Sequence, residues 1–301
     1  MRGLVAVDWG TSSLRIARMD AQGRVIEERS SAQGILIVPG GDFATVFIAA
    51  CADWVRADGS FCLMSGMVGS RQGWLEAPYC ACPAGFADVA GALAWLMPAP
   101  GGARVAIVPG LSCEHDGVPD VMRGEEVQVF GALQVLDLQD ATLVLPGTHS
   151  KWVTVRGQQI HGFSTFMTGE FYSLLRQHSI LSRTLPPEDG ALDEAAFDRG
   201  VTQALAGGSL LSTAFSVRTL SLMDRMAAQA LPSYLSGLVI GEELRASAPA
   251  GGMVVVMGAP ALAVRYERAL AHLGVPTRRV GSEATWRGLW AIAQTLERGT
   301  P

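Results

Sequence analysis

The chain has 301 residues, of which 49% are hydrophobic and 17% are charged, and this composition excludes a disordered or low-complexity protein. The formal net charge of −5 argues against a nucleic-acid partner, because phosphate backbones are bound by clustered positive charge. No apolar run approaches the ~20 residues of a membrane-spanning helix, so no membrane association is expected.

The length exceeds that at which a single hydrophobic core usually stops growing, and two domains are therefore expected. We predict an N-terminal domain over 1–138 and a C-terminal domain over 139–301, with the last helix free to pack back near the hinge between them. Five cysteines, an odd number, fit reduced thiols better than a disulfide framework. Because the N-terminus also lacks the long apolar stretch of a signal peptide, a cytoplasmic protein is expected.

The predicted first domain opens on three short strands joined by tight turns, at 4–8, 13–19 and 24–29. Apolar residues at helical spacing predict a helix over 43–57. The stretch "FCLMS" indicates a strand that enters the glycine-rich "GMVGS". The elements expected after it are a helix over 87–97, a strand at "ARVAIVPG" and a helix over 124–137.

The predicted second domain repeats this opening, because "ATLVLPGTHSKWVTV" has two apolar arms around a turn. A strand at "QIHGFSTF", the turn "MTGE" and a helix to about Leu181 follow, and 182–230 is expected to be mostly helical. Pro232 favours the first turn of a helix. The remaining elements are a buried strand at "MVVVMGAP", a helix ending at His272, a strand over 275–280 and a final helix from Ser282.

Both strand–turn–strand segments place small and hydroxylated residues in the turn, "DWGTSS" from Asp8 and "PGTHSK" from Pro146. Such turns can direct successive N–H groups into one concavity that binds an anion. A carboxylate such as Asp8 would repel bare phosphate but can hold Mg²⁺, which bridges phosphate oxygens. A plain hairpin is the alternative for either turn alone, whereas the two together favour a polyphosphate site. The sequence contains neither a P-loop nor a dinucleotide-binding glycine motif.

The second turn also holds the most unusual basic residue of the chain. Of the 23 basic residues, Lys151 is the only lysine. A lysine ammonium is a compact point charge suited to phosphate, whereas the arginine fork is wide and planar. We therefore expect Lys151 to contact phosphate, with the chance survival of one lysine as the alternative.

Three glutamates are candidates for acid–base or binding roles. Phosphoryl transfer to an alcohol needs a base near the acceptor hydroxyl. Glu125 and Glu126 stand where a loop becomes a helix, and Glu170 in "MTGE" occupies a similar position. Acids are favoured in any first helical turn by the helix dipole, so the residues alone leave catalytic and structural roles equally open.

These motifs together resemble the sugar kinase, Hsp70 and actin superfamily and, within it, the 2-dehydro-3-deoxygalactonokinases. The resemblance rests on stretches that occur in the family's order from Asp8 to about Ala293: "DWGTSSLR", "GMVGSRQGWLEAPY", "IVPGL", "VMRGEE", "LPGTHSKWV", "FMTGE", "SGLVIGEE" and "GLWAIA". It implies an α/β fold of two ribonuclease-H-like domains with an interdomain nucleotide cleft. It also implies ATP and Mg²⁺ as cofactors and phosphorylation of 2-dehydro-3-deoxy-D-galactonate at O6, in galactonate catabolism.

The resemblance assigns roles to individual positions. Asp8 would organise Mg²⁺, and Glu125 would be the base, with Glu126 as the second choice. The second turn begins with Pro146 where most of the superfamily has Asp, which leaves Asp8 as the main metal carboxylate. The ATP-binding residues would be Gly10, Thr11 and Ser12 for phosphate in the first turn, Gly147, Thr148, His149, Ser150 and Lys151 for phosphate in the second, and Gly258 and Ala259 for adenosine.

A 2-keto acid substrate requires a cation for its carboxylate. Arg123 and Arg71, both in loops within the matching motifs, are the candidates for a bidentate pair. Ser70 and Tyr79 are candidates for hydrogen bonds to substrate hydroxyls, with loop packing as the alternative. Glu170 completes the predicted substrate-binding residues.

Two other classes of protein remain as alternatives. A phosphate-ester or polyphosphate hydrolase would use the same turns with Glu125 activating water, but a long basic groove is not evident in the sequence. A nucleotide-dependent structural or regulatory protein would need an appended binding segment, and the sequence shows none. The expected partners are therefore a small sugar acid and ATP. The oligomeric state is left open, with a homodimer as the arrangement to test.

Overall fold

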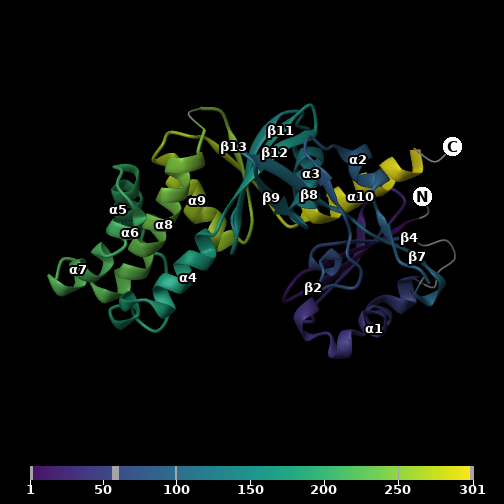
Figure 1. Cartoon of the computed structure of the whole chain (residues 1–301), viewed down its shortest axis with the longest axis horizontal. Helices are drawn as coiled ribbons and strands as arrows, with labels where there is room; N and C mark the ends of the chain where they lie inside the picture. Colours follow the sequence, from purple (N-terminus) through teal and green to yellow (C-terminus); the bar gives the residue numbers. More distant parts are fainter. Residues whose placement is uncertain (1–2, 56–60, 99, 250, 299–301) are drawn as a thin grey trace. The chain divides into compact units, whose positions relative to one another are not determined.

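The computed structural model describes residues 3–55, 61–98, 100–249 and 251–298 (Figure 1). These residues form two compact units. Unit 1 contains the described residues up to 141, together with 153–163 and those from 282 onward, and unit 2 contains 142–152 and 164–281. The domain boundary expected at 138/139 stays a prediction.

The centre of unit 1 is a sheet made of β1 (Leu4–Trp9), β2 (Leu14–Met19), β3 (Val25–Ser31), β4 (Phe61–Ser65), β6 (Ala94–Trp95) and β7 (Arg104–Ile107). Its strand order is β3-β2-β1-β4-β7-β6. β2 runs antiparallel to both of its neighbours, β1 and β3, whereas β4 runs parallel to β1 and β7 runs parallel to β4. β1 and β4 are central and almost fully buried, which explains their continuous apolar sequences.

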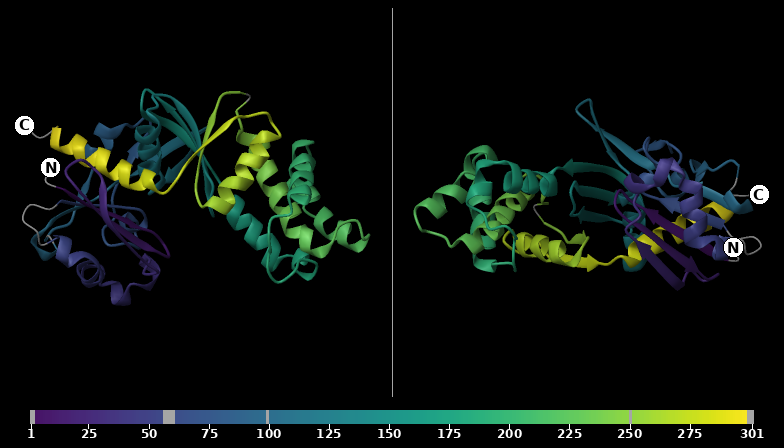
Figure 2. Two further views of the ribbon diagram at one scale, coloured as in Figure 1. Left: turned by 180° about the vertical axis from the view of Figure 1, so that it is seen from behind. Right: turned by 90° about the horizontal axis from the view of Figure 1, so that it is seen from below.

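Unit 1 also contains α1 (Phe43–Val55), α2 (Phe86–Gly91), α3 (Glu125–Leu136), α10 (Glu283–Arg298) and the small sheet of β5 (Tyr79–Ala81), β8 (Gly110–His115) and β9 (Val118–Met122). α10, yellow in Figure 2, packs on α3 and α2. A Cβ on Gly131 would lie 1.7 Å from the carbonyl oxygen of Ala284, and one on Gly288 would lie 1.9 Å from that of Val127. Glycine at these two positions therefore permits the close approach that fixes α3 in unit 1.

The second sheet is made of β10 (Ala141–Leu145), β11 (Ser150–Arg156), β12 (Gln159–Phe166), β13 (Val254–Met257) and β14 (Thr277–Val280). Its order is β12-β11-β10-β13-β14, with β13 parallel to both β10 and β14. This order repeats that of the first five strands of the unit 1 sheet, β3-β2-β1-β4-β7. The repeated arrangement confirms the predicted α/β fold with two ribonuclease-H-like halves.

The α-helices described in unit 2 are α4 (Thr168–His178), α5 (Glu194–Leu205), α6 (Leu210–Thr213), α7 (Ser216–Leu222), α8 (Leu231–Ser247) and α9 (Pro260–Ala271). α8 is buried over most of its length and packs against α5, α4 and α9. Pro232 lies in its first turn, as predicted. Among the described helices, none is both long and apolar enough to cross a bilayer.

The strand predictions around the two turns are confirmed, but two other predictions are wrong and one hairpin was missed. The helix expected over 87–97 ends at Gly91, and β6 follows because its residues pair with β7. The hairpin of β8 and β9 was not predicted, since its polar turn at Asp116 and Gly117 obscures two short strands. "MTGE" is not a separate turn, because α4 begins at Thr168. The helix expected over 43–57 extends to Val55, and positions 56 and 57 lie outside the described residues.

Candidate active site

In unit 1, the ends of two central strands and the start of α3 meet at one place. Asp8 in β1 is paired with Ser65 in β4, and Gly66 follows with a positive φ of 96°. A Cβ on Gly66 would lie 3.3 Å from Asp8 Oδ1, and one on Gly124 would lie 3.2 Å from the Cα of Gly66. Gly124 is the N-cap of α3, so the structure brings Asp8 close to the helix start that carries Glu125 and Glu126.

Asp8 has a partner that the sequence analysis missed. Arg15 lies opposite it in β2, and its Nη2 and Nε donate to Asp8 Oδ2 at 2.5 and 3.1 Å. Arg15 also packs over the Trp286 ring at 5.4 Å and donates to Thr285 Oγ1 at 3.4 Å. The register of the β1–β2 hairpin was the available signal, because a turn centred on 11–12 places 8 opposite 15.

The two glutamates at the start of α3 differ in their surroundings. Glu125 is half-buried, and its Oε2 accepts the main-chain N–H of Arg123 at 3.0 Å. Glu126 is fully buried, with Oε2 accepting the N–H of Gly124 at 2.6 Å and Oε1 without a hydrogen-bond partner among the described residues. Burial, together with repulsion from Glu125, raises the pKa of Glu126 to about 8. Glu126 therefore keeps its proton at neutral pH.

Arg123 is buried, and its guanidinium is only partly satisfied. Nη2 donates to the carbonyl of Ala77 at 2.8 Å, while Nε and Nη1 have no hydrogen-bond partner in the described part of the chain. The guanidinium carbon lies 4.4 Å from the centre of the Tyr79 ring. The buried hydroxyl of Ser70 is likewise unpartnered there. Buried donors without partners are rare in folded proteins, and a charged one is suited to an anionic ligand.

The other predicted arginine is placed very differently. Arg71 is 88% exposed at its side chain and pairs with Glu76 at 3.0 Å. An ion pair of a guanidinium this exposed is weak, because water and salt screen the charges. Of the two arginines, the structure favours Arg123 as the partner of a substrate carboxylate.

The first turn is tight and open to solvent. Gly10 N–H donates to the carbonyl of Ser13 at 2.9 Å, and the side chains of Thr11 and Ser12 are exposed. Gly34 packs directly against the turn, and only glycine fits there, since a Cβ would lie 2.2 Å from the Thr11 carbonyl oxygen. Gly34 was not predicted, and no motif in the sequence indicated it.

The second turn meets two other segments within unit 2. It follows β10, and Gly258 follows the neighbouring parallel strand β13 with a positive φ of 152°. A Cβ on Gly258 would lie 3.2 Å from the carbonyl oxygen of Pro146. A Cβ on Gly169, at the start of α4, would lie 2.4 Å from the carbonyl oxygen of Gly147. The structure thus places the predicted phosphate and adenosine residues of this unit side by side, with Ala259 as the N-cap of α9.

Three polar side chains of the second turn already have protein partners. His149 Nε2 lies 2.6 Å from Glu170 Oε2, so these two predicted residues are together. The Glu170 N–H also donates to the carbonyl of Thr148 at 3.0 Å. The Ser150 hydroxyl is buried and donates to Glu243 at 2.7 Å, and Lys151, also buried, donates from Nζ to Thr165 at 2.6 Å.

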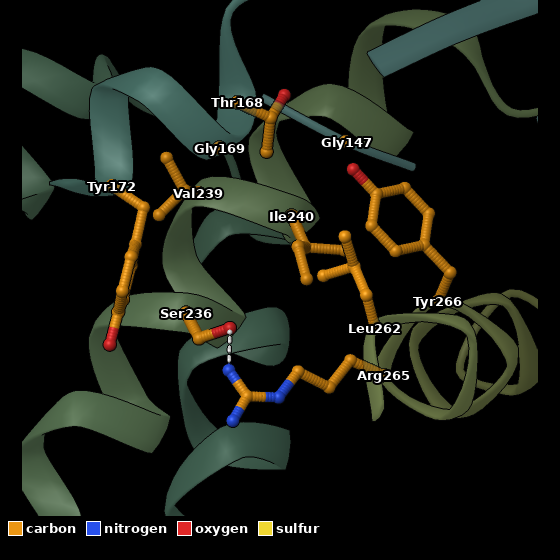
Figure 3. A pocket seen from close by; sticks show the side chains of 10 residues that line it. All are labelled: Gly147, Thr168, Gly169, Tyr172, Ser236, Val239, Ile240, Leu262, Arg265 and Tyr266. Carbon is orange, nitrogen blue, oxygen red and sulfur yellow. Dashed lines mark hydrogen bonds between the residues drawn. The ribbon is translucent and has the colours of Figure 1, made fainter. Parts of the chain in front are cut away.

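A hollow opens beside the second turn, between α4, α8 and α9 (Figure 3). Gly147 and Thr168 lie at one end and Ser236 with Arg265 at the other, where Arg265 Nη1 donates to Ser236 Oγ at 3.0 Å. The remaining side chains that line it are largely apolar or aromatic: Tyr172, Val239, Ile240, Leu262 and Tyr266. Such a lining suits a flat, mostly apolar group with a few polar atoms.

Two sheets of the same order, each with a hydroxylated turn after its first strand, define the fold of the sugar kinase, Hsp70 and actin superfamily. A solved structure of a Sinorhizobium meliloti protein assigned as a 2-dehydro-3-deoxygalactonokinase matches this chain with a TM-score of 0.90 and 36% identity, covering 97% of this chain and 98% of that one. Component A of (R)-2-hydroxyglutaryl-CoA dehydratase from Acidaminococcus fermentans matches with a TM-score of 0.51 at 13% identity, which shows the fold alone.

Sequence comparison identifies the family. The model of the 2-keto-3-deoxy-galactonokinase family matches residues 8–292. The 2-dehydro-3-deoxygalactonokinase of Escherichia coli (strain K12) is 33% identical over 296 residues, covering 97% of this chain and 98% of that protein. A relative from Rhizobium meliloti (strain 1021), assigned to the same activity, is 36% identical over 297 residues, covering 97% and 96%. The chain belongs to the 2-keto-3-deoxy-galactonokinase family.

Proposed function

We propose that this chain transfers the γ-phosphoryl group of ATP to the 6-hydroxyl of 2-dehydro-3-deoxy-D-galactonate, a step of galactonate catabolism. Membership of the family supports the class of reaction. The observation that carries the proposal for this chain is the buried Arg123, whose Nε and Nη1 lack partners among the described residues. A buried cation with free donors fits the carboxylate of a 2-keto acid.

The acceptor side of the reaction belongs to unit 1. In the proposal, Arg123 binds the substrate carboxylate, and Ser70 and Tyr79 contact its hydroxyls. Glu125 is the base: as the bond from O6 to phosphorus forms and the bond between phosphorus and ADP breaks, the O6 proton passes to its carboxylate. Glu126 is a poorer base at neutral pH, because burial and the neighbouring Glu125 raise its pKa to about 8.

The ATP side involves both turns. We assign phosphate contacts to Gly10, Thr11 and Ser12 and to the segment from Gly147 to Lys151. Because the Ser150 hydroxyl donates to Glu243, Thr148, His149 and Lys151 are the side chains of the second turn that we expect to contact phosphate. The hollow beside Gly147 would hold the nucleoside, with Gly258 and Ala259 at the adjoining strand end.

Asp8 is the residue of this chain that fits Mg²⁺. Its Oδ2 is occupied by Arg15, and the hydrogen bonds described for Asp8 leave Oδ1 available. Asp8 would hold Mg²⁺ together with water and phosphate oxygens. When bound, Mg²⁺ would neutralise charge on the phosphate oxygens.

The product tests the proposal directly. We would incubate the chain with Mg-ATP and 2-dehydro-3-deoxy-D-galactonate and record a proton–phosphorus correlation spectrum of the product. The proposal predicts a coupling between phosphorus and the two protons on carbon 6. A coupling of phosphorus to protons on another carbon would contradict the proposal, and so would inorganic phosphate as the sole new phosphorus species. The second outcome would favour the hydrolase alternative.

The proposal extends to the cellular compartment and to the oligomeric state. The reaction would take place in the cytoplasm, and the five free cysteines support a reducing compartment. A homodimer is the proposed oligomeric state, to be tested by light scattering after size-exclusion chromatography. A mass equal to that of one chain would contradict it.

A further inference from the structure

One buried carboxylate in unit 2 collects hydrogen bonds from several segments. Glu243 on α8 is 2% exposed. Its Oε1 accepts from Ser150 Oγ and from Trp152 Nε1, each at 2.7 Å. Its Oε2 accepts from Tyr266 Oη at 2.7 Å and from Thr168 Oγ1. These donors come from β11, from the first turn of α4 and from α9.

Glu243 is paired with neutral donors only, since no ion pair to it occurs among the described residues. Burial raises its pKa, while the four donors act in the opposite direction. Burying a carboxylate away from any cation is costly unless hydrogen bonds satisfy it. We therefore expect the Glu243 carboxylate to hold its four hydrogen-bond donors in a defined arrangement.

The partners of Glu243 connect it to the segments around the second turn. Ser150 directly follows His149 of that turn. Thr168 precedes Gly169, whose Cα approaches Gly147 so closely that a Cβ would lie 2.4 Å from its carbonyl oxygen. Thr168 and Tyr266 also line the hollow, although Glu243 itself does not. One carboxylate therefore links the second turn, the start of α4 and α9.

We propose that Glu243 is a positioning residue for nucleotide binding, which sets the second turn relative to the two helices that line the hollow. This inference rests on the proposed function, in which ATP occupies that turn and hollow. Glu243 would contact neither ATP nor the sugar acid. Its effect would be confined to nucleotide affinity, whereas a residue needed only for stability would not distinguish the two substrates.

Glu243→Gln is the appropriate change, because it preserves the size of the side chain. A glutamine offers one carbonyl oxygen and two N–H donors, so it cannot accept from four donors at once. Glu242→Gln is the matched control: it alters the preceding residue of α8, which pairs with Arg245 at the surface. Trp152→Phe, which removes one donor at a residue that does not line the hollow, is a second variant.

The experiment measures Mg-ADP affinity by calorimetry and the two KM values by ADP-release assay. For Glu243→Gln we expect the Kd for Mg-ADP and the KM for ATP to rise about tenfold or more, with the KM for the sugar acid at saturating ATP unchanged. Trp152→Phe should show a smaller rise in the same two quantities, and Glu242→Gln none. If Glu243→Gln does not fold, the Kd for Mg-ADP and the KM for ATP of Trp152→Phe test the inference.

Wild-type nucleotide affinity in folded Glu243→Gln, or in Trp152→Phe when only that variant folds, would overturn the inference. So would equal rises in both KM values, or a wild-type chain that binds no Mg-ADP. A wild-type chain that binds Mg-ADP but does not phosphorylate the acid would instead contradict the proposed function. In that case the affinity comparison would still test Glu243.

Discussion

The two turns of this chain occupy the same position in two sheets of the same order, yet the protein supports them differently. The first turn follows a strand that presents Asp8, which is paired across the hairpin with Arg15, and its hydroxyl side chains are exposed. The second turn begins with Pro146, and the buried Glu243 holds the residues that follow it. Shared topology thus fixes where a turn lies, while the side chains around it determine its role.

This difference suggests a division of labour between the units. Unit 1 gathers the candidate metal carboxylate, the candidate base and the unsatisfied Arg123, which are groups for the acceptor and for chemistry. Unit 2 gathers the hollow and the glycines that line it, which are features for a nucleotide. Substitutions of Glu125 or Arg123 in unit 1 should therefore change kcat or the KM for the sugar acid, and substitutions of the residues that line the hollow in unit 2 should change the KM for ATP.

The largest effect is expected for the base. Glu125→Gln should lower kcat by about 10²- to 10⁴-fold with little change in either KM, because the amide cannot accept the O6 proton. Glu126→Gln is the matched control, and it should lower kcat far less. Steady-state kinetics at pH 7 would check both. A greater loss in Glu126→Gln would transfer the role to that residue.

The next effect concerns the substrate carboxylate. Arg123→Met should raise the KM for the sugar acid about 10- to 100-fold, since a charged hydrogen bond contributes about 1.5–3 kcal/mol. Arg71→Met, which removes an exposed pair with Glu76, should leave both KM values unchanged. Initial rates over a range of acid concentrations at saturating ATP would measure this. Equal effects of the two variants would remove the distinction between a buried and an exposed arginine.

A smaller effect, on the kinetics with ATP, is expected for Lys151 in unit 2. Lys151→Arg should lower kcat/KM for ATP by about tenfold, because the wider guanidinium does not fit the buried space beside Thr165. Arg156→Lys, at an exposed position of the same strand, is the control for an exchange of basic residues. Wild-type kinetics in Lys151→Arg would mean that arginine is accepted there.

The smallest effect is on stability, and it depends on pH. The pKa of Glu126 is raised to about 8 in the folded chain, so the folded state holds this proton more tightly than the unfolded state. The stability from this group is complete below its unfolded pKa of about 4.5 and is lost as pH rises toward 8. Relative to the wild type, Glu126→Gln should therefore gain a few degrees in Tm between pH 5 and pH 8.5. Thermal denaturation across that range would show it, and a constant difference would contradict the raised pKa.

Much of the fold could be predicted from local patterns in the sequence. The apolar strands and the turns at Gly10 and Gly147 are continuous in the chain, so the repeated opening of each half was visible. The stretch around Trp95 was predicted as helix, because apolar content alone does not distinguish a short strand from a helix. Its strand character comes from pairing with β7, which is a tertiary contact.

The residues of the candidate site could be predicted from the sequence motifs, but their tertiary partners and their burial could not. Glu243 lies within the matching stretch "SGLVIGEE", but its partners are up to 93 residues away, and no local pattern reveals that they meet it. The choice between Arg123 and Arg71 was also hidden, since both are loop arginines in matching motifs. Burial separates them, and the contacts that accompany the burial of Arg123, with the Ala77 carbonyl and the Tyr79 ring, are tertiary.

The central claim is that this chain is a kinase for a galactonate-derived acid, and ADP release tests it most directly. The assay would supply Mg-ATP with 2-dehydro-3-deoxygalactonate, with its gluconate-derived epimer, or with no acceptor. The account predicts turnover with the galactonate-derived acid and none without an acceptor, while comparable rates on both epimers would widen the substrate but keep the kinase. ADP release that does not depend on the acceptor would contradict the account.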